Sequence, residues 1–161
     1  MTGDKGLETL LVWQKSLAFA VEVCKTILPK LPIQEKWSLV DQLRRSAQSI
    51  PANIAEGYGR FYFQESVRFC YIARGSLEET FSHLTLAHKL DYLDDETYKR
   101  LNDQIIELRR MISGYIAFLK ESKRGASEPG ASHHIREDVS DYIIEDNASP
   151  PSDSNIEYRS F

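Results

Sequence analysis

The chain has 161 residues, 42% of them hydrophobic and 27% charged, with a formal net charge of −4. This length fits one domain with an additional segment, and the composition excludes a collagen-like or wholly disordered chain. No apolar run approaches the roughly 18 residues that a membrane span needs, and the first ten residues lack the apolar core of a signal peptide. The two cysteines, Cys24 and Cys70, form no CxxC motif, which is typical of a reducing compartment. We therefore expect a cytoplasmic protein without a membrane segment.

Charge and composition divide the chain near residue 124. Residues 1–124 hold 18 lysines and arginines against 16 acidic residues, so their net charge is +2, whereas residues 125–161 hold two arginines against eight acidic residues and carry −6. The second part is rich in Gly, Ser and Pro and cannot bury enough apolar surface to offset the entropy of folding. We predict a folded core at 7–123 and an acidic, disordered tail at 124–161.

The first predicted helix covers residues 10–31. Its apolar side chains recur at steps of three and four, which is the spacing of one helix face. They are Leu10, Trp13, Leu17, Ala20, Cys24, Ile27 and Leu31. Pro29 and Pro32 cannot continue a helix, so we expect it to end there.

The second predicted helix covers residues 40–54, and Gly57 and Gly59 after it are natural helix-terminating residues. Its apolar positions are Val40, Leu43, Ala47, Ile50 and Ile54. Pro51 lies within this pattern, and the apolar phase continues across it. We therefore expect a kink or local break near residues 47–51 and a helix that continues beyond it.

Two further helices are predicted at residues 63–88 and 98–119. Asp94, Asp95 and Glu96 precede the last helix, where acidic side chains cap free N–H groups and meet the positive end of the helix dipole. No segment alternates with a period of two, so the fold class is all-α. Four amphipathic helices with short connections bury their apolar faces most simply as an antiparallel up-down-up-down four-helix bundle.

The first and third predicted helices carry more apolar side chains than one seam needs. Val12 and Phe19 lie away from the predicted seam of the first helix, and Phe69 and Ile72 lie away from that of the third. Either both helices are deeply buried, or these side chains contact another subunit, because large exposed apolar patches usually mark interfaces. We favour a homo-oligomer with these four residues at its interface.

A polar stripe follows the second predicted helix along residues 42–60. Its members fall within about 80° of one another on the side opposite the apolar face. They are Arg45, Ser49, Asn53, Glu56 and Arg60. Periodicity alone leaves two interpretations open, a solvated helix face or a binding surface.

Three sequence blocks resemble one protein family. They are LLVWQKS at 10–16, QLRRSAQSIPANIAEGYGR at 42–60 and RFCYIARGSLEE at 68–79. Together they resemble the bacterial four-helix-bundle family named for proteins encoded in intervening sequences of large-subunit ribosomal RNA genes. That family includes relatives of the accessory variability protein of diversity-generating retroelements. The resemblance covers about residues 8–121 and does not include the acidic tail.

The resemblance implies a bundle assembled as a ring-like homopentamer without enzymatic activity. The retroelement accessory proteins of this fold present basic surface to nucleic acid and associate with a reverse transcriptase, so RNA, DNA and a reverse transcriptase are the implied partners. The positions that match the family's blocks are Arg44, Arg45, Pro51, Asn53, Glu56, Gly57, Arg68, Arg74, Gly75 and Glu78.

The matched polar residues fall into two groups. Arg74 lies on the apolar seam of the third helix, where an unpaired charge is costly, so we expect Glu78 or Glu56 to pair with it. The resulting structural polar network consists of Asn53, Glu56, Arg74 and Glu78. Arginines outside the seams can bind phosphates through charge-assisted hydrogen bonds, which makes them candidates for nucleic-acid binding. These are Arg44, Arg45, Arg60 and Arg68.

Four aromatic residues lie beside Arg60 in the connection between the second and third helices. They are Tyr58, Phe61, Tyr62 and Phe63. Such a combination suits stacking on single-stranded bases. The alternative is that these rings fill the turn or an interface.

No catalytic, metal or cofactor motif is found. His83 and His88 are five residues apart, roughly 140° around a helix, so they do not share a helix face as metal ligands four residues apart do. Gly57-Tyr58-Gly59 follows a helix and lacks the Gly-Lys-Ser/Thr of a phosphate loop. Two functions remain. The first is a non-enzymatic oligomer associated with structured RNA or a reverse-transcriptase complex, and the second is a protein–protein scaffold ring that never contacts nucleic acid.

Overall fold

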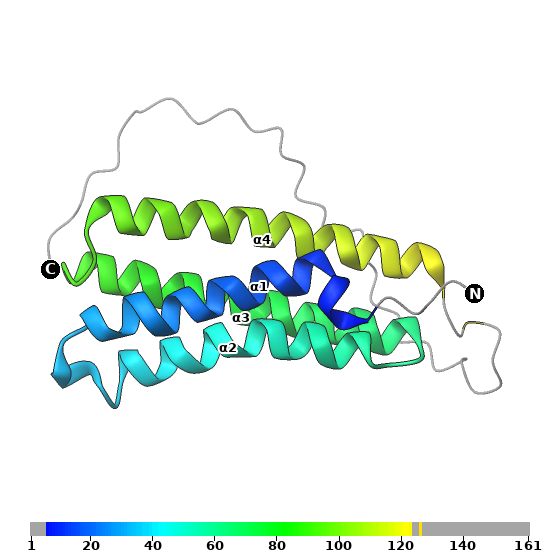
Figure 1. Ribbon diagram of the computed structural model, residues 1–161, viewed down its shortest axis with the longest axis horizontal. Helices are drawn as coiled ribbons and strands as arrows, with labels where there is room; N and C mark the ends of the chain where they lie inside the picture. The colour runs from blue at the N-terminus through cyan, green and yellow to red at the C-terminus, as the bar shows by residue number, and fades with distance from the viewer. Residues whose placement is uncertain (1–5, 124–125, 127–161) are drawn as a thin grey trace, which may run out of the picture. The chain divides into compact units, whose positions relative to one another are not determined.

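The computed structural model describes residues 6–123 and Ala126 (Figure 1). Four long helices form an antiparallel up-down-up-down bundle, and within the described residues there is no strand, which confirms the predicted all-α fold. The helices are α1 (Leu11–Glu22), α2 (Leu39–Tyr58), α3 (Phe63–Lys89) and α4 (Asp95–Ser122). No helix in this part of the chain is long and apolar enough to cross a membrane. The predicted tail, Ala126 excepted, lies outside the described residues.

The predicted seam of the first helix is only partly the buried one. Ala20, Ile27 and Leu31 of that seam are buried, but the α1 side chains that lie deepest in the core include two outside it. Val12 and Phe19 are only 4% and 2% exposed and belong to the core of the chain itself, whereas Leu17 and Val21 lie on the surface. The prediction that Val12 and Phe19 face outward, toward another subunit, is therefore wrong. Their area is already buried against the neighbouring helices of the same bundle.

A π-helical turn, η2 (Val23–Ile27), accounts for the shift between the predicted seam and the buried one. Both apolar stripes of α1 satisfy the three-and-four spacing, so periodicity does not choose between them. In the π-turn each turn takes more residues than in an α-helix. The buried seam therefore runs from Phe19 in steps of four through Val23 and Ile27 to Leu31. A short 3₁₀ turn, η3 (Leu28–Lys30), then ends the segment.

Helix α2 runs unbroken from Leu39 to Tyr58 with Pro51 inside it. The prediction that the helix continues beyond Pro51 is thus confirmed, whereas a local break in it at residues 47–51 is not observed. Proline has no N–H to offer the carbonyl four residues earlier, which costs one helical hydrogen bond. Ala47, Ile50 and Ile54 are each fully buried on the same face, and this packing holds the helix together across the proline.

Helices α2 and α3 pack along a row of small hydroxyl side chains. The Oγ atoms of Ser49 and Ser76 lie 2.8 Å apart, and Thr80 donates a hydrogen bond to Ser46 Oγ at 3.0 Å. Asn53 donates to the carbonyl oxygen and Oγ of Ser49 at 2.8 and 2.9 Å. Buried polar groups are stable only when they are hydrogen-bonded, and these groups satisfy one another. The seam thus fixes how α2 and α3 lie against each other.

The connection from α3 to α4 is closed by polar contacts. Asp94 caps α4, because its Oδ1 accepts a hydrogen bond from the Thr97 N–H at 2.7 Å and its Oδ2 accepts one from the Thr97 hydroxyl at 2.9 Å. The backbone hydrogen bond from Thr97 lowers the pKa of Asp94. On the α3 side, His88 Nε2 lies 2.7 Å from Asp95 Oδ1, and the His88 ring stacks on Tyr98 with centroids 4.3 Å apart. The acidic residues at 94 and 95 thus act where the sequence predicts.

Candidate nucleic-acid interface

The four arginines predicted to bind nucleic acid lie in two pairs. Arg44 and Arg45 are in the first half of α2, whereas Arg60 lies two residues beyond its end and Arg68 lies in the second turn of α3. At 1.5 Å per residue, Arg45 and Arg60 are roughly 20 Å apart along the helix axis. These arginines therefore do not form one compact site within a single chain.

The four arginines also differ in whether a carboxylate pairs with them. Arg45 Nη2 lies 3.3 Å from Asp41 Oδ2, and Arg60 pairs with Glu56 one turn earlier. Arg44 and Arg68 are exposed, and neither has an ion pair within the described part of the chain. Arg44 and Arg68 are thus the pair whose positive charge is not already matched by a carboxylate.

The aromatic residues between α2 and α3 have divided roles. Phe63 begins α3 and packs against the core, as expected of a residue that fills the turn. Phe61 is 49% exposed, and its ring meets Tyr62 edge to face with centroids 5.2 Å apart. The Arg60 guanidinium lies over the ring of Phe69 at 5.1 Å. Phe63 therefore fills the turn, and stacking on bases stays a prediction for the other rings.

The predicted polar network is not one connected cluster. Asn53 belongs to the hydroxyl seam between α2 and α3, and Glu56 pairs with Arg60. Glu78 accepts two hydrogen bonds from Arg109 on α4, at 2.6 and 2.7 Å. This paired, planar geometry is the strongest form of an arginine–carboxylate contact, and it raises the pKa of Arg109.

Arg74 does not pair with Glu78 or Glu56, contrary to the prediction. Its guanidinium lies over the ring of Tyr71 at 5.0 Å from the centroid. Lys120, near the end of α4, lies 5.4 Å from the same centroid and donates a hydrogen bond to the Tyr71 hydroxyl at 2.8 Å. No sequence pattern connects Tyr71 with Lys120, because they lie 49 positions apart. Only the packing of α3 against α4 brings them together.

Groups that could hold a metal ion are absent from the described residues. No three His, Cys, Asp or Glu side chains gather there in a suitable arrangement. His83 Nε2 is buried without a hydrogen-bond partner, and the nearest carboxylate oxygen, of Glu79, is 3.6 Å away. His88, in the last turn of α3, contacts Asp95 in the first turn of α4.

The family model of the 23S rRNA-intervening sequence proteins matches residues 8–114. The chain belongs to this family. The solved structures include a protein of unknown function from the S23 ribosomal protein family of Bacteroides thetaiotaomicron, which is 28% identical to this chain with a TM-score of 0.61. That match covers 66% of this chain and 98% of the other. No curated protein matches the chain.

Membership of the intervening-sequence family covers α1 to α3 and most of α4, including all four predicted arginines. It confirms the resemblance found in the three sequence blocks. The similar solved protein has unknown function, so family membership establishes the fold and leaves the chemistry to be argued from the side chains.

In this intervening-sequence protein, Phe69 and Ile72 remain candidates for contact with another subunit. Ile72 on α3 is 44% exposed, and Phe69 is half-buried. Gly75, one turn beyond Ile72, has open space where a side chain would be, so the surface there is low and accessible to a partner. The interface stays a prediction for Phe69 and Ile72.

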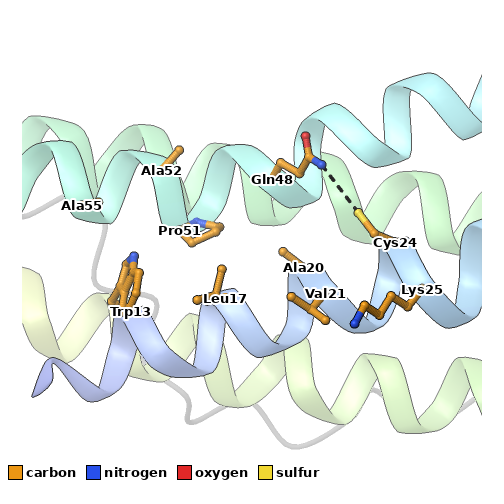
Figure 2. A pocket seen from close by; sticks show the side chains of 10 residues that line it. All are labelled: Trp13, Leu17, Ala20, Val21, Cys24, Lys25, Gln48, Pro51, Ala52 and Ala55. Carbon is orange, nitrogen blue, oxygen red and sulfur yellow. Dashed lines mark hydrogen bonds between the residues drawn. The ribbon is translucent and has the colours of Figure 1, made fainter. Parts of the chain in front are cut away.

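An apolar groove of about 440 Å³ lies between α1 and α2 (Figure 2). Its lining is almost entirely apolar, with Lys25 and Gln48 toward one end. The other lining residues are Trp13, Leu17, Ala20, Val21, Cys24, Pro51, Ala52 and Ala55. Gln48 Nε2 lies 3.8 Å from Cys24 Sγ across the groove. The face of α1 that was predicted to be core thus forms one wall of a surface groove.

Proposed function

We propose that this protein is a non-enzymatic homo-oligomer, a ring of five subunits, that binds nucleic acid through exposed basic side chains. The observation that carries the proposal is the state of Arg44 and Arg68, which are exposed and without an ion pair among the described residues. A guanidinium that is not engaged by a carboxylate can donate charge-assisted hydrogen bonds to phosphate oxygens without first breaking an internal contact.

Assembly into a ring compensates for the distance between the arginine pairs. A closed ring repeats each arginine around its circumference, so one nucleic acid molecule contacts several subunits at once. Several weak contacts on one assembly give an avidity that a single chain lacks. Structured RNA, alone or bound to a reverse transcriptase, is the ligand that we propose.

The test measures binding of a labelled RNA hairpin with a single-stranded extension, by fluorescence anisotropy. Arg44→Ala with Arg68→Ala removes the two unpaired members of the four candidate arginines. Arg45→Ala with Arg60→Ala removes the two paired members and is a control with the same change in net charge. We expect the first variant to bind about tenfold more weakly or worse, and the control to change less. Wild-type protein that binds neither RNA nor DNA at low salt would refute the function.

A protein–protein scaffold ring is the second candidate, and exposed apolar side chains favour it. Trp37 is 83% exposed, and Ile33 nearby in the α1–α2 connection is 76% exposed. Tryptophan is enriched at the centres of protein interfaces. If RNA and DNA both fail to bind while the oligomer is intact, the scaffold becomes the better explanation.

A further inference from the structure

Tyr71 lies between two cations that come from different helices. Arg74 follows it by one turn on α3 and lies over its ring at 5.0 Å, and Lys120 on α4 contacts its hydroxyl at 2.8 Å. Both cations are within 5.4 Å of the same ring centroid. All three side chains are half-buried, so they are more restricted than fully exposed lysines and arginines. We call them the Tyr71 cluster.

The positive charge of the Tyr71 cluster is not neutralised by the residues that the structure describes. Neither Arg74 nor Lys120 forms an ion pair there. Glu78, one turn beyond Arg74, is held by both of its oxygens against Arg109. Glu121 is next to Lys120 in sequence, but consecutive helix residues are about 100° apart, so it faces elsewhere. Two like charges close to one ring repel each other, and a bound anion would relieve that repulsion.

The hydrogen-bonding groups of the cluster fit a phosphate. The Tyr71 hydroxyl oxygen accepts from Lys120, so its own hydrogen remains to be donated to a further acceptor. Arg74 presents a planar guanidinium with several N–H groups, and Lys120 has three hydrogens of which one is used. One hydroxyl, one guanidinium and one ammonium can therefore donate to the same group of oxygens.

We propose that Tyr71, Arg74 and Lys120 form a binding site for a backbone phosphate of nucleic acid, an inference that rests on the proposed function. The exposed and unpaired Arg68 lies three residues before Tyr71, on the same side of α3. The cluster thus continues the surface of Arg68 onto α4, and the two bind neighbouring phosphates of one strand.

The experiment uses the full chain and the same labelled RNA over a series of salt concentrations. Arg74→Ala with Lys120→Ala is compared with Lys89→Ala and Lys99→Ala, which removes two exposed lysines near the α3–α4 connection. We expect the cluster variant to bind about tenfold more weakly or worse and to lower the slope of log affinity against log salt by about two. The control variant keeps a slope closer to that of the wild type. Tyr71→Phe keeps the ring and should weaken binding about two- to tenfold through loss of the hydroxyl.

Melting temperatures of all variants show whether a loss of binding reflects unfolding. If the wild type binds RNA and the folded cluster variant binds with the same affinity and slope, the phosphate site is refuted while the proposed function stands. If the wild type binds no nucleic acid, the proposed function itself fails. If inorganic phosphate at constant ionic strength shifts the NMR signals of Arg74 and Lys120 whereas RNA does not, the cluster is a site for the free anion and the proposal is also overturned.

Discussion

At Gly57 helices α2 and α3 lie very close together. A Cβ atom placed there would lie 3.0 Å from Phe69 Cβ and 3.0 Å from the Ser66 carbonyl oxygen. A backbone carbonyl in a helix cannot move aside as the end of a flexible side chain can. Glycine is thus required by the closeness of the two helices and not by an unusual backbone angle.

Replacing Gly57 by alanine should destabilise the protein by about 1–3 kcal/mol, because the added methyl group overpacks this contact. The control is Gly114→Ala in α4, where a Cβ would have no atom within 4 Å. That change should be neutral or raise stability by up to about 1 kcal/mol, since alanine favours a helix. Urea unfolding of both variants measures the difference. Equal stabilities for the two would show that α2 and α3 separate easily.

The arginines show how far side-chain roles could be predicted from residue types. The sequence pattern predicts that Arg44 and Arg68 are exposed, because both lie outside the apolar seams. The partner of Glu78 does not follow, because Arg109 is 31 positions away and reaches it only across two packed helices. The sequence pattern instead predicts a pair with Arg74, the nearest cation in the sequence.

At the scale of the helices, the existence and order of the elements could be predicted but the orientation of α1 could not. Repeated steps of three and four, the acidic cap at Asp94 and short connections determine four antiparallel helices. Helix α1 is short and has apolar side chains on two faces, and its continuation is a π-turn that shifts the phase. Only its packing against the rest of the bundle decides which face is buried.

Phe19→Ala should destabilise the bundle by about 3–5 kcal/mol, because it removes a fully packed ring and leaves a cavity. Leu17→Ala, two residues earlier, is the matched control on the exposed face of the same helix and should cost much less. Thermal and urea unfolding give both values. If Leu17→Ala lowers the free energy of unfolding more than Phe19→Ala does, Leu17 is on the buried face, as the sequence pattern predicts.

The cap of α4 gives the protein a pH dependence in acid. The hydrogen bonds from Thr97 lower the pKa of Asp94 in the folded state below its value in the unfolded chain. A lowered folded-state pKa contributes stability above the unfolded pKa of about 3.9, and this contribution is lost as the pH falls through the folded value. Asp94→Ala should therefore lower the melting temperature at pH 7, and its difference from the wild type should narrow in acid.

Asp94→Asn separates the charge from the cap, since asparagine caps a helix about as well as aspartate. It should retain more stability than the alanine variant at neutral pH. Because its amide does not titrate, it should lose less stability in acid than the wild type. Melting curves from pH 7 to pH 3 test both statements. A constant gap between wild type and alanine variant over this range would argue against the ionised cap.

At the scale of the whole molecule, the positions of the charged side chains matter more for binding an anion than the net charge does. The chain carries a net −4, so binding of an anionic polymer depends on clustered unpaired cations and on their repetition in an oligomer.

Ile72→Glu should dissociate the proposed ring without unfolding the bundle, because it places a charge at a desolvated contact. Phe118→Glu, at a 62% exposed position on α4, is the control for adding one charge to the surface. Light scattering coupled to gel filtration gives the mass of each. A wild-type monomer at micromolar concentration would contradict the oligomer, and an unchanged mass for Ile72→Glu would remove this residue from the interface.

The two thiols of the chain have opposite chemical reactivity. Cys70 is buried, and desolvation raises its pKa to about 12, so at neutral pH it remains a protonated, shielded thiol. Cys24 is partly exposed in the groove between α1 and α2 (Figure 2). A maleimide dye should therefore attach to the native protein at one position, with no engineered cysteine. The labelling rate then reports directly whether a partner or another subunit covers that groove.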